Sequence, residues 1–211
     1  MSQSSPPDLQ DELLIVVVRR ASLETDKNGA ARVGALRAAA LSALSAAARA
    51  QGAELGSLKK DERDAPMPNA GWYWSLSHTS SGTRGLAAAC VSRSAVGVDA
   101  EAVRSASPEV IAAAMSAQER ALFRGREDSE AFTRTWIAKE AVLKKLGLGL
   151  MALSQVRLED VDDDACVLEH AGVRHAVEVR AFDAFLVAVA GRARERVDWR
   201  CDEGPALEQR A

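Results

Sequence analysis

The chain has 211 residues, with 27 Lys and Arg against 30 Asp and Glu and a formal net charge of -3. This balance argues against a nucleic-acid-binding protein that works through bulk positive charge. The three cysteines are odd in number and have no CxxC spacing, which argues against a disulfide framework or zinc knuckle and favours a reducing, cytoplasmic location. With no basic-then-apolar leader and no run of eighteen apolar residues, we expect no membrane contact.

The first half predicts a strand, a helix and further strands. Residues 13–18 form a continuous apolar run that is mostly β-branched, which predicts a buried strand. Residues 30–50, rich in Ala, Leu and Arg, predict a helix. Residues 57–71 contain prolines and charges and predict a loop, followed by a strand at 72–77. Residues 86–91 and 95–98 then predict a hairpin that ends at Asp99.

The second half begins with helical signals and continues with short strands. Pro108 predicts a helix start, Ser116-Ala-Gln-Glu119 is a capping-box pattern, and a long helix is expected at 129–146, ended by Gly147. Four strand-like segments follow at 156–158, 166–168, 173–179 and 185–190, and their short gaps favour antiparallel pairing.

These elements predict an α+β fold with two subdomains. A long helix and a small antiparallel sheet occur in each half, which is compatible with two related units packed about a pseudo-two-fold axis. The expected boundaries are 11–103 and 104–201, with disordered tails at 1–10 and 202–211. The interface between such units is a common place for a ligand cleft.

Three carboxylates and two lysines are concentrated in two segments. Asp99-Ala-Glu101 places both acidic side chains on one side of a strand, and Lys139, Glu140 and Lys144 lie within an arc of roughly 140° on a helix. Carboxylates brought together attract a hard divalent cation, Mg²⁺ or Mn²⁺, and lysines beside such an ion suit phosphate. Taken alone, each segment has a simpler interpretation, a polar strand end and a solvated i,i+4 pair.

Three segments, in this order, resemble the signature of the 4′-phosphopantetheinyl transferases, especially the larger, monomeric surfactin-type group. They are Trp74-Ser-Leu-Ser77-His78-Thr79, Gly97-Val-Asp99-Ala-Glu101 and Trp136-Ile-Ala-Lys139-Glu140-Ala-Val-Leu-Lys144. The resemblance covers roughly residues 60–155. It implies a monomeric, pseudodimeric α+β fold that binds coenzyme A and Mg²⁺ between its halves. The implied reaction transfers the 4′-phosphopantetheine arm of coenzyme A to a serine of an acidic apo acyl or peptidyl carrier protein and releases adenosine 3′,5′-bisphosphate.

The resemblance also implies roles for single side chains, by their positions in the motifs. The metal ligands would be Asp99, Glu101 and Glu140. Coenzyme A would be contacted at a phosphate by Ser77 and His78, and at the pyrophosphate by Lys139 and Lys144. The carboxylate proposed in this family as the general base corresponds to Glu119, with Lys144 as the rival base.

The sequence departs from the surfactin-type pattern before the Ser-His segment. Asp64-Ala65-Pro66 stands where relatives have Gly-Lys-Pro, so the lysine that would meet the nucleotide is absent. The candidate substitutes are Lys59, Lys60, Arg63 and Arg32. Arg120, Arg124 and Arg126 are either a docking strip for the acidic carrier or a solvated helix face.

Two other functions remain open on the sequence alone. The same carboxylates could direct water in a metal-dependent hydrolase of coenzyme A or a related nucleotide. The missing lysine also leaves open a protein that binds coenzyme A or a carrier without turnover.

Overall fold

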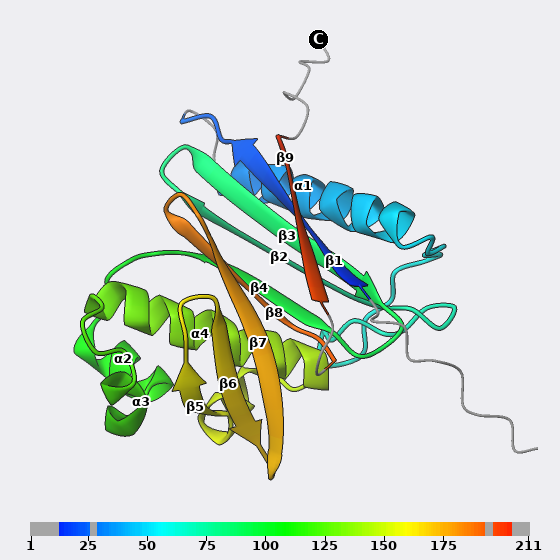
Figure 1. The fold of residues 1–211 in the computed structure, drawn as a ribbon. Coiled ribbons are helices and arrows are strands. Elements are labelled where there is room, and N and C mark those ends of the chain that lie inside the picture. Colours follow the sequence, from blue (N-terminus) through cyan, green and yellow to red (C-terminus); the bar gives the residue numbers. More distant parts are fainter. Residues whose placement is uncertain (1–12, 26–28, 193–195, 204–211) are drawn as a thin grey trace, which may run out of the picture.

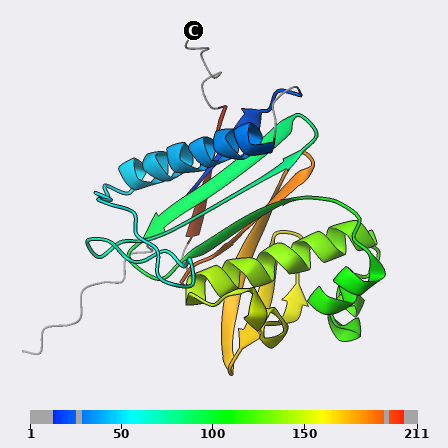
Figure 2. The same ribbon diagram turned by 180° about the vertical axis from the view of Figure 1, so that it is seen from behind.

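The computed structural model describes residues 13–25, 29–192 and 196–203, which form two sheets, each covered by a long helix (Figures 1 and 2). Figure 2 shows both helices on the same side of the molecule. The mixed α+β class predicted from the sequence is confirmed. No helix among the described residues is long and apolar enough to cross a membrane.

The first sheet has four strands in the order β2-β3-β1-β9. Their bounds are β1 Leu13–Ser22, β2 Tyr73–Ser81, β3 Arg84–Ser92 and β9 Arg196–Glu203. Helix α1, Gly29–Ala50, packs on this sheet through small and aliphatic side chains that include Ala43 and Leu44. All pairs in the sheet are antiparallel except that of β1 with β9, which is parallel.

The second sheet has five antiparallel strands in the order β4-β8-β7-β6-β5. Their bounds are β4 Gly97–Ala102, β5 Arg157–Val161, β6 Ala165–His170, β7 Val173–Phe182 and β8 Phe185–Ala190. The helices of this half are α2 Pro108–Ala114, α3 Ala117–Ala121, α4 Asp128–Leu146 and the 3₁₀ helix η1 Leu150–Gln155. Helix α4 packs on the sheet and buries Ile137, Ala141 and Val142 against it.

The hairpin predicted at residues 86–98 is wrong. Residues 86–91 lie in β3, which pairs with β1 and β2, whereas β4 pairs with β8 in the other sheet. The reason is the packing at Gly97, because a Cβ there would lie 2.0 Å from the carbonyl oxygen of Ala141. The backbone of α4 therefore rests directly on the start of β4 and holds this strand in the second sheet.

Two strands pair in the sheet of the opposite half, across the predicted boundary between residues 103 and 104. Strand β4 precedes the boundary but pairs in the second sheet, and β9 follows it but pairs with β1 in the first. The two halves are therefore interlocked by an exchange of edge strands. Of the predicted tails, 1–10 and 204–211 lie outside the described residues, whereas 202–203 end β9. The pseudo-two-fold axis stays a prediction.

Candidate active site

The two sheets meet where their edge strands β2 and β4 lie side by side. The contact is made by alternate side chains of β2: Ser77 Oγ donates to Asp99 Oδ1 at 2.9 Å, and Thr79 Oγ1 donates to Glu101 Oε2 at 3.0 Å. Ser75 Oγ accepts the backbone N–H of Val98 at 3.0 Å. Hydroxyl groups thus take the place of a backbone ladder between the strands. The Ser-x-Ser-x-Thr pattern of β2 and the Asp-x-Glu pattern of β4 form one unit.

Helix α4 brings a cation and a third carboxylate to the same place. Lys144 Nζ donates to Asp99 Oδ1 at 2.7 Å and to the carbonyl oxygen of Val98 at 3.1 Å. Asp99 is only 6 % exposed, and its second oxygen, Oδ2, is buried without a hydrogen-bond partner. Such an unsatisfied buried oxygen is costly and calls for an explanation.

Burial and neighbouring negative charge raise the pKa of two of these carboxylates, Glu140 and Glu101. Burial, reinforced by Asp99 and by Glu101, raises the pKa of Glu140 to about 7, although Lys144 opposes the shift. The pKa of Glu101 is also raised, by burial first and by Asp99 second. Burial is the main cause of both shifts, and the charge of Asp99 is the second. Asp99, Glu101 and Glu140 are therefore close enough to influence one another electrostatically, and their role as metal ligands stays a prediction.

This donor set fits a hard divalent cation. All the candidate ligands are carboxylate oxygens, and the buried Asp99 Oδ2 has no hydrogen-bond partner. A cation would also favour the ionised form of Glu140, whose pKa is raised by burial and by the charge of Asp99. Among the described residues, however, no three Asp, Glu, His or Cys side chains already converge as a metal cluster. The carboxylates are thus neighbours rather than a closed ligand shell, and Lys144 is the cation that contacts Asp99.

His78 lies beside this group, and the structure adds a residue that the sequence did not indicate. Burial lowers the pKa of His78, and the positive charges of Lys144 and Arg37 lower it further. Arg37 is exposed on α1. Several arginines occur on this helix, and only its packing on the sheet shows that Arg37 is near enough to affect the pKa of His78. The neighbouring cations make this end of the site suitable for a phosphate group.

Lys139 and Glu119 lie apart from the three carboxylates. Lys139 Nζ contacts Glu119 Oε1 at 2.8 Å and donates to the carbonyl oxygen of Ala114 at 2.8 Å. Both side chains are buried, at 3 % and 4 % residue exposure. The structure therefore brings together Ser77, His78, Asp99, Glu101, Glu140 and Lys144 but places Lys139 and Glu119 in a separate buried contact. Their predicted roles at the pyrophosphate and as general base receive no support from this geometry.

The loop cations and the arginine strip are mostly engaged in ion pairs or backbone contacts. Lys60 pairs with Asp64 at 2.7 Å, and Arg32 donates to the carbonyl oxygens of Glu24 and Gly82. The predicted strip is not one helix face, because α3 ends at Ala121 and leaves Arg124 outside it. The other two arginines are paired within this half, Arg120 with Asp128 and Arg126 with Glu130 and Asp163.

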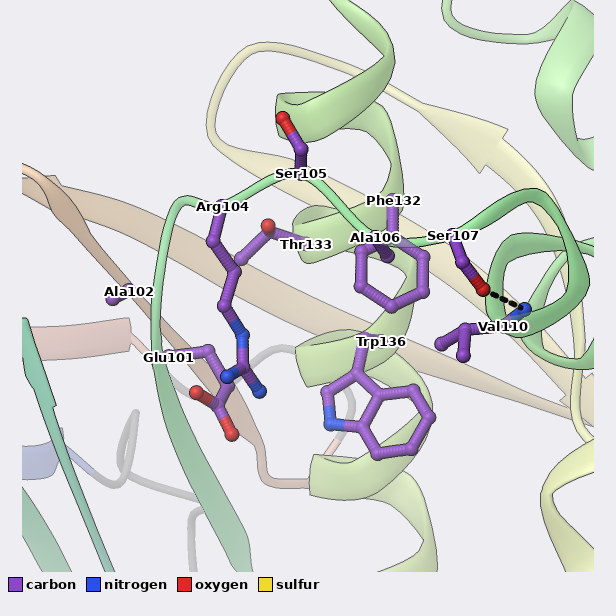
Figure 3. A pocket seen from close by; sticks show the side chains of 10 residues that line it. All are labelled: Glu101, Ala102, Arg104, Ser105, Ala106, Ser107, Val110, Phe132, Thr133 and Trp136. Carbon is purple, nitrogen blue, oxygen red and sulfur yellow. Dashed lines mark hydrogen bonds between the residues drawn. The ribbon is translucent and has the colours of Figure 1, made fainter.

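A cavity of about 300 Å³ adjoins Glu101. Figure 3 shows the Arg104 guanidinium next to the Glu101 carboxylate at one end, with the rings of Phe132 and Trp136 along α4. These ring centroids are 6.0 Å apart. The remaining lining comes from the end of β4, from the segment between β4 and α2, and from one residue each of α2 and α4. These residues are Ala102, then Ser105, Ala106 and Ser107, then Val110 and Thr133. The cavity thus joins an apolar wall to a charged end.

The part of the chain that holds these features resembles a known family. Residues 95–190 match the family model of the 4′-phosphopantetheinyl transferase superfamily. The matched segment runs from the residues before β4 to the end of β8, so it contains all three carboxylates, Lys144 and the cavity. Ser77 and His78 lie outside it. No curated protein matches the chain. The match supports the superfamily for this segment, and the surfactin-type subgroup stays a prediction.

Proposed function

We propose that the protein transfers the 4′-phosphopantetheine arm of coenzyme A to a serine of an apo acyl or peptidyl carrier protein. One observation carries the proposal: Asp99, Glu101 and Glu140 come from two elements to one place, within the segment that matches the superfamily. The finer assignment to the monomeric surfactin-type group rests on the order of the three motifs.

The residues would divide the work as follows. Asp99, Glu101 and Glu140 would hold Mg²⁺ or Mn²⁺, which when bound neutralises charge on the pyrophosphate. Ser77 keeps Asp99 oriented through its hydrogen bond to Oδ1 and leaves Oδ2 open. Arg37 offers positive charge, and the imidazole of His78, whose pKa is lowered, offers a hydrogen-bond donor to a second phosphate of coenzyme A. Catalysis would be mainly electrostatic positioning.

The cavity would receive the pantetheine arm. Phe132 and Trp136 supply apolar contact for its carbon chain, and the hydroxyls of Ser105 and Ser107 can bond its amides. Glu101 and Arg104 form the charged end of the cavity, so an arm bound in the cavity would have its phosphate near Glu101, Asp99 and Glu140.

Transfer breaks the bond between the pantetheine phosphate and the bridging oxygen of the pyrophosphate, and forms a bond from that phosphorus to the serine oxygen. The bridging oxygen leaves with adenosine 3′,5′-bisphosphate, and the serine loses a proton. Of the two predicted bases, Lys144 lies among the carboxylates, whereas Glu119 is buried against Lys139.

The test is to mix the protein with several apo carriers, coenzyme A and Mg²⁺. Intact mass spectrometry should show the added arm on a carrier serine, with one adenosine 3′,5′-bisphosphate released for each arm transferred. Cleavage of coenzyme A without a modified carrier would instead indicate the hydrolase. Coenzyme A binding without any product would indicate a protein that has lost turnover.

Arg37 gives a separate prediction about coenzyme A. Replacement of Arg37 by glutamine should raise the KM for coenzyme A by about 10-fold, because one charge-assisted contact to a phosphate is lost. The kcat should change little if the contact is equal in the ground and transition states. Arg49→Gln, an exposed change on the same helix, is the matched control. An unchanged KM for Arg37→Gln would remove this residue from the site.

A further inference from the structure

The contact between Glu119 and Lys139 is the most buried ion pair among those described. Their Nζ and Oε1 atoms are 2.8 Å apart, and the side chains are 5 % and 4 % exposed. Burial of two charges is costly unless every remaining hydrogen-bonding atom also finds a partner. The contacts around this pair show how that cost is met.

The hydrogen bonds of the pair join four segments of the second half. Lys139, on α4, donates to the carbonyl oxygen of Ala114 at the end of α2. Glu119 Oε1 accepts the backbone N–H of Leu158 on β5 at 2.8 Å. Its Oε2 accepts the N–H of Ser116 at 2.7 Å, closing the capping box that starts α3. Helices α2 and α3 are thereby fixed to α4 and β5 at one point.

This point controls a wall of the cavity beside Glu101. Val110 on α2, with residues 104–107 before it, lines one side, and Phe132 and Trp136 on α4 line the other. The hydrogen bond from Lys139 to the carbonyl oxygen of Ala114 connects the end of α2 to α4, and the ion pair with Glu119 holds Lys139 in place, so the two contacts together set the spacing between these walls. Lys139 lies one helical turn beyond Trp136 and Thr135, on the same helix that forms the wall.

Glu119 is poorly arranged to take a proton from a substrate. Three donors, from Leu158, Lys139 and Ser116, occupy its oxygens. Burial acts to raise its pKa, but these hydrogen bonds outweigh burial and hold the pKa below its usual value. A carboxylate that is buried, fully bonded and less basic than usual is suited to holding structure.

We propose that Glu119 and Lys139 are positioning residues that set the width of the cavity for the arm of coenzyme A and touch none of the reacting atoms. The inference rests on the proposed function, because it takes the arm as the occupant of the cavity. It replaces the predicted role of Glu119 as general base and that of Lys139 at the pyrophosphate.

The two roles predict opposite results in a double-mutant cycle of Glu119→Gln and Lys139→Met. Each single variant leaves one buried group without its partner, so we expect the KM for coenzyme A to rise about 10-fold and residues 104–116 to exchange amide hydrogens faster. The double variant removes both buried charges and should slow exchange again, but methionine cannot donate to the carbonyl oxygen of Ala114, so the KM should stay raised about 10-fold with kcat near wild type. A catalytic base predicts a kcat loss of about 10²- to 10⁴-fold in Glu119→Gln and no recovery in the double variant. That result would overturn the proposal.

Asp128→Asn is the matched control, because it breaks the exposed ion pair of Asp128 with Arg120 between the same helices. It should leave KM and exchange at wild-type values, since exposed pairs contribute little. If both single variants fail to fold, the double variant decides: a folded protein with a raised KM and near wild-type kcat supports the proposal, and a protein that is unfolded, inactive or near wild type in KM overturns it. If wild type transfers nothing, the proposed function fails, whereas hydrogen exchange and calorimetric binding of coenzyme A still test the pair.

Discussion

Replacing Glu140 by glutamine is expected to abolish transfer and at the same time to stabilise the metal-free protein at pH 8. Transfer should fall by at least about 10²-fold, because one of the three oxygen ligands is lost from the proposed cation site. Stability should rise because the substitution removes a carboxylate that is half-buried next to Asp99 and Glu101. Opposite effects on activity and stability are typical of functional sites.

The stability effect has a defined pH dependence. In the folded, metal-free protein the pKa of Glu140 is raised from 4.5 to about 7. The folded state therefore binds this proton more tightly than the unfolded chain, and the resulting stabilisation is fully present below pH 4.5 and lost as the pH rises to 7. Glutamine does not ionise, so the variant does not lose stability as the pH rises. The variant should match wild type near pH 4.5 and exceed it by about 1 to 3 kcal/mol at pH 8, allowing for partial exposure.

Urea unfolding at both pH values, with a chelator present, measures this difference. Glu127→Gln, at the exposed start of the same helix, is the matched control and should change neither stability nor transfer. If Glu140→Gln were less stable than wild type at pH 8, the ionised Glu140 carboxylate would not destabilise the folded protein, which contradicts the raised pKa.

The second large effect is expected from Gly97→Ala, in the strand that carries Asp99 and Glu101. The added Cβ would lie 2.0 Å from the carbonyl oxygen of Ala141 and 2.5 Å from the backbone nitrogen of Lys145. These are backbone atoms of α4 and cannot rotate away, so helix and strand must separate. We expect a loss of about 3 kcal/mol, the upper end for an overpacked core. Transfer should fall about 10²-fold in the protein that remains folded, because the carboxylates of β4 and α4 move apart.

Gly34→Ala is the control for this substitution. Gly34 lies inside α1, where an added Cβ meets no atom within 4 Å. Alanine should stabilise that helix by about 0.5 to 1 kcal/mol and leave transfer unchanged. Thermal unfolding and the transfer assay compare the two variants. Wild-type stability in Gly97→Ala would mean that α4 and β4 are not in backbone contact.

Local signals predicted most of the elements, because these are encoded by neighbouring residues, but strand β9 and the 3₁₀ helix η1 were missed. Ser116 and Glu119 form both hydrogen bonds of the predicted capping box, and Gly147 ends α4 with a left-handed φ of 66°. Proximity along the sequence did not predict which strands pair. Strand β4 follows β3 closely but pairs with β8, and β9 returns from the end of the described chain to pair with β1. Such pairings depend on contacts between distant segments.

The roles of the site residues stay predictions, but the structure places these residues in two separate groups for a geometric reason. The β-strand period of two puts Asp99 and Glu101 on one side of β4, and α4 brings Glu140 and Lys144 to them. Adjacent residues on a helix, however, differ by about 100°, so Lys139 points to α2 and α3 while Glu140 faces β4. Helix α4 is packed on more than one side, and an arc of about 140° was too wide to count as one face.

The central claim is that Asp99, Glu101 and Glu140 together hold one divalent cation. Titration with Mn²⁺, monitored by its electron paramagnetic resonance signal in the presence of coenzyme A, tests this most directly because it needs no carrier and no turnover. We expect one ion bound per chain in wild type and in Glu127→Gln, with binding weakened about 10-fold or more in Asp99→Asn and in Glu140→Gln. Equal Mn²⁺ affinity in all four proteins would contradict the claim.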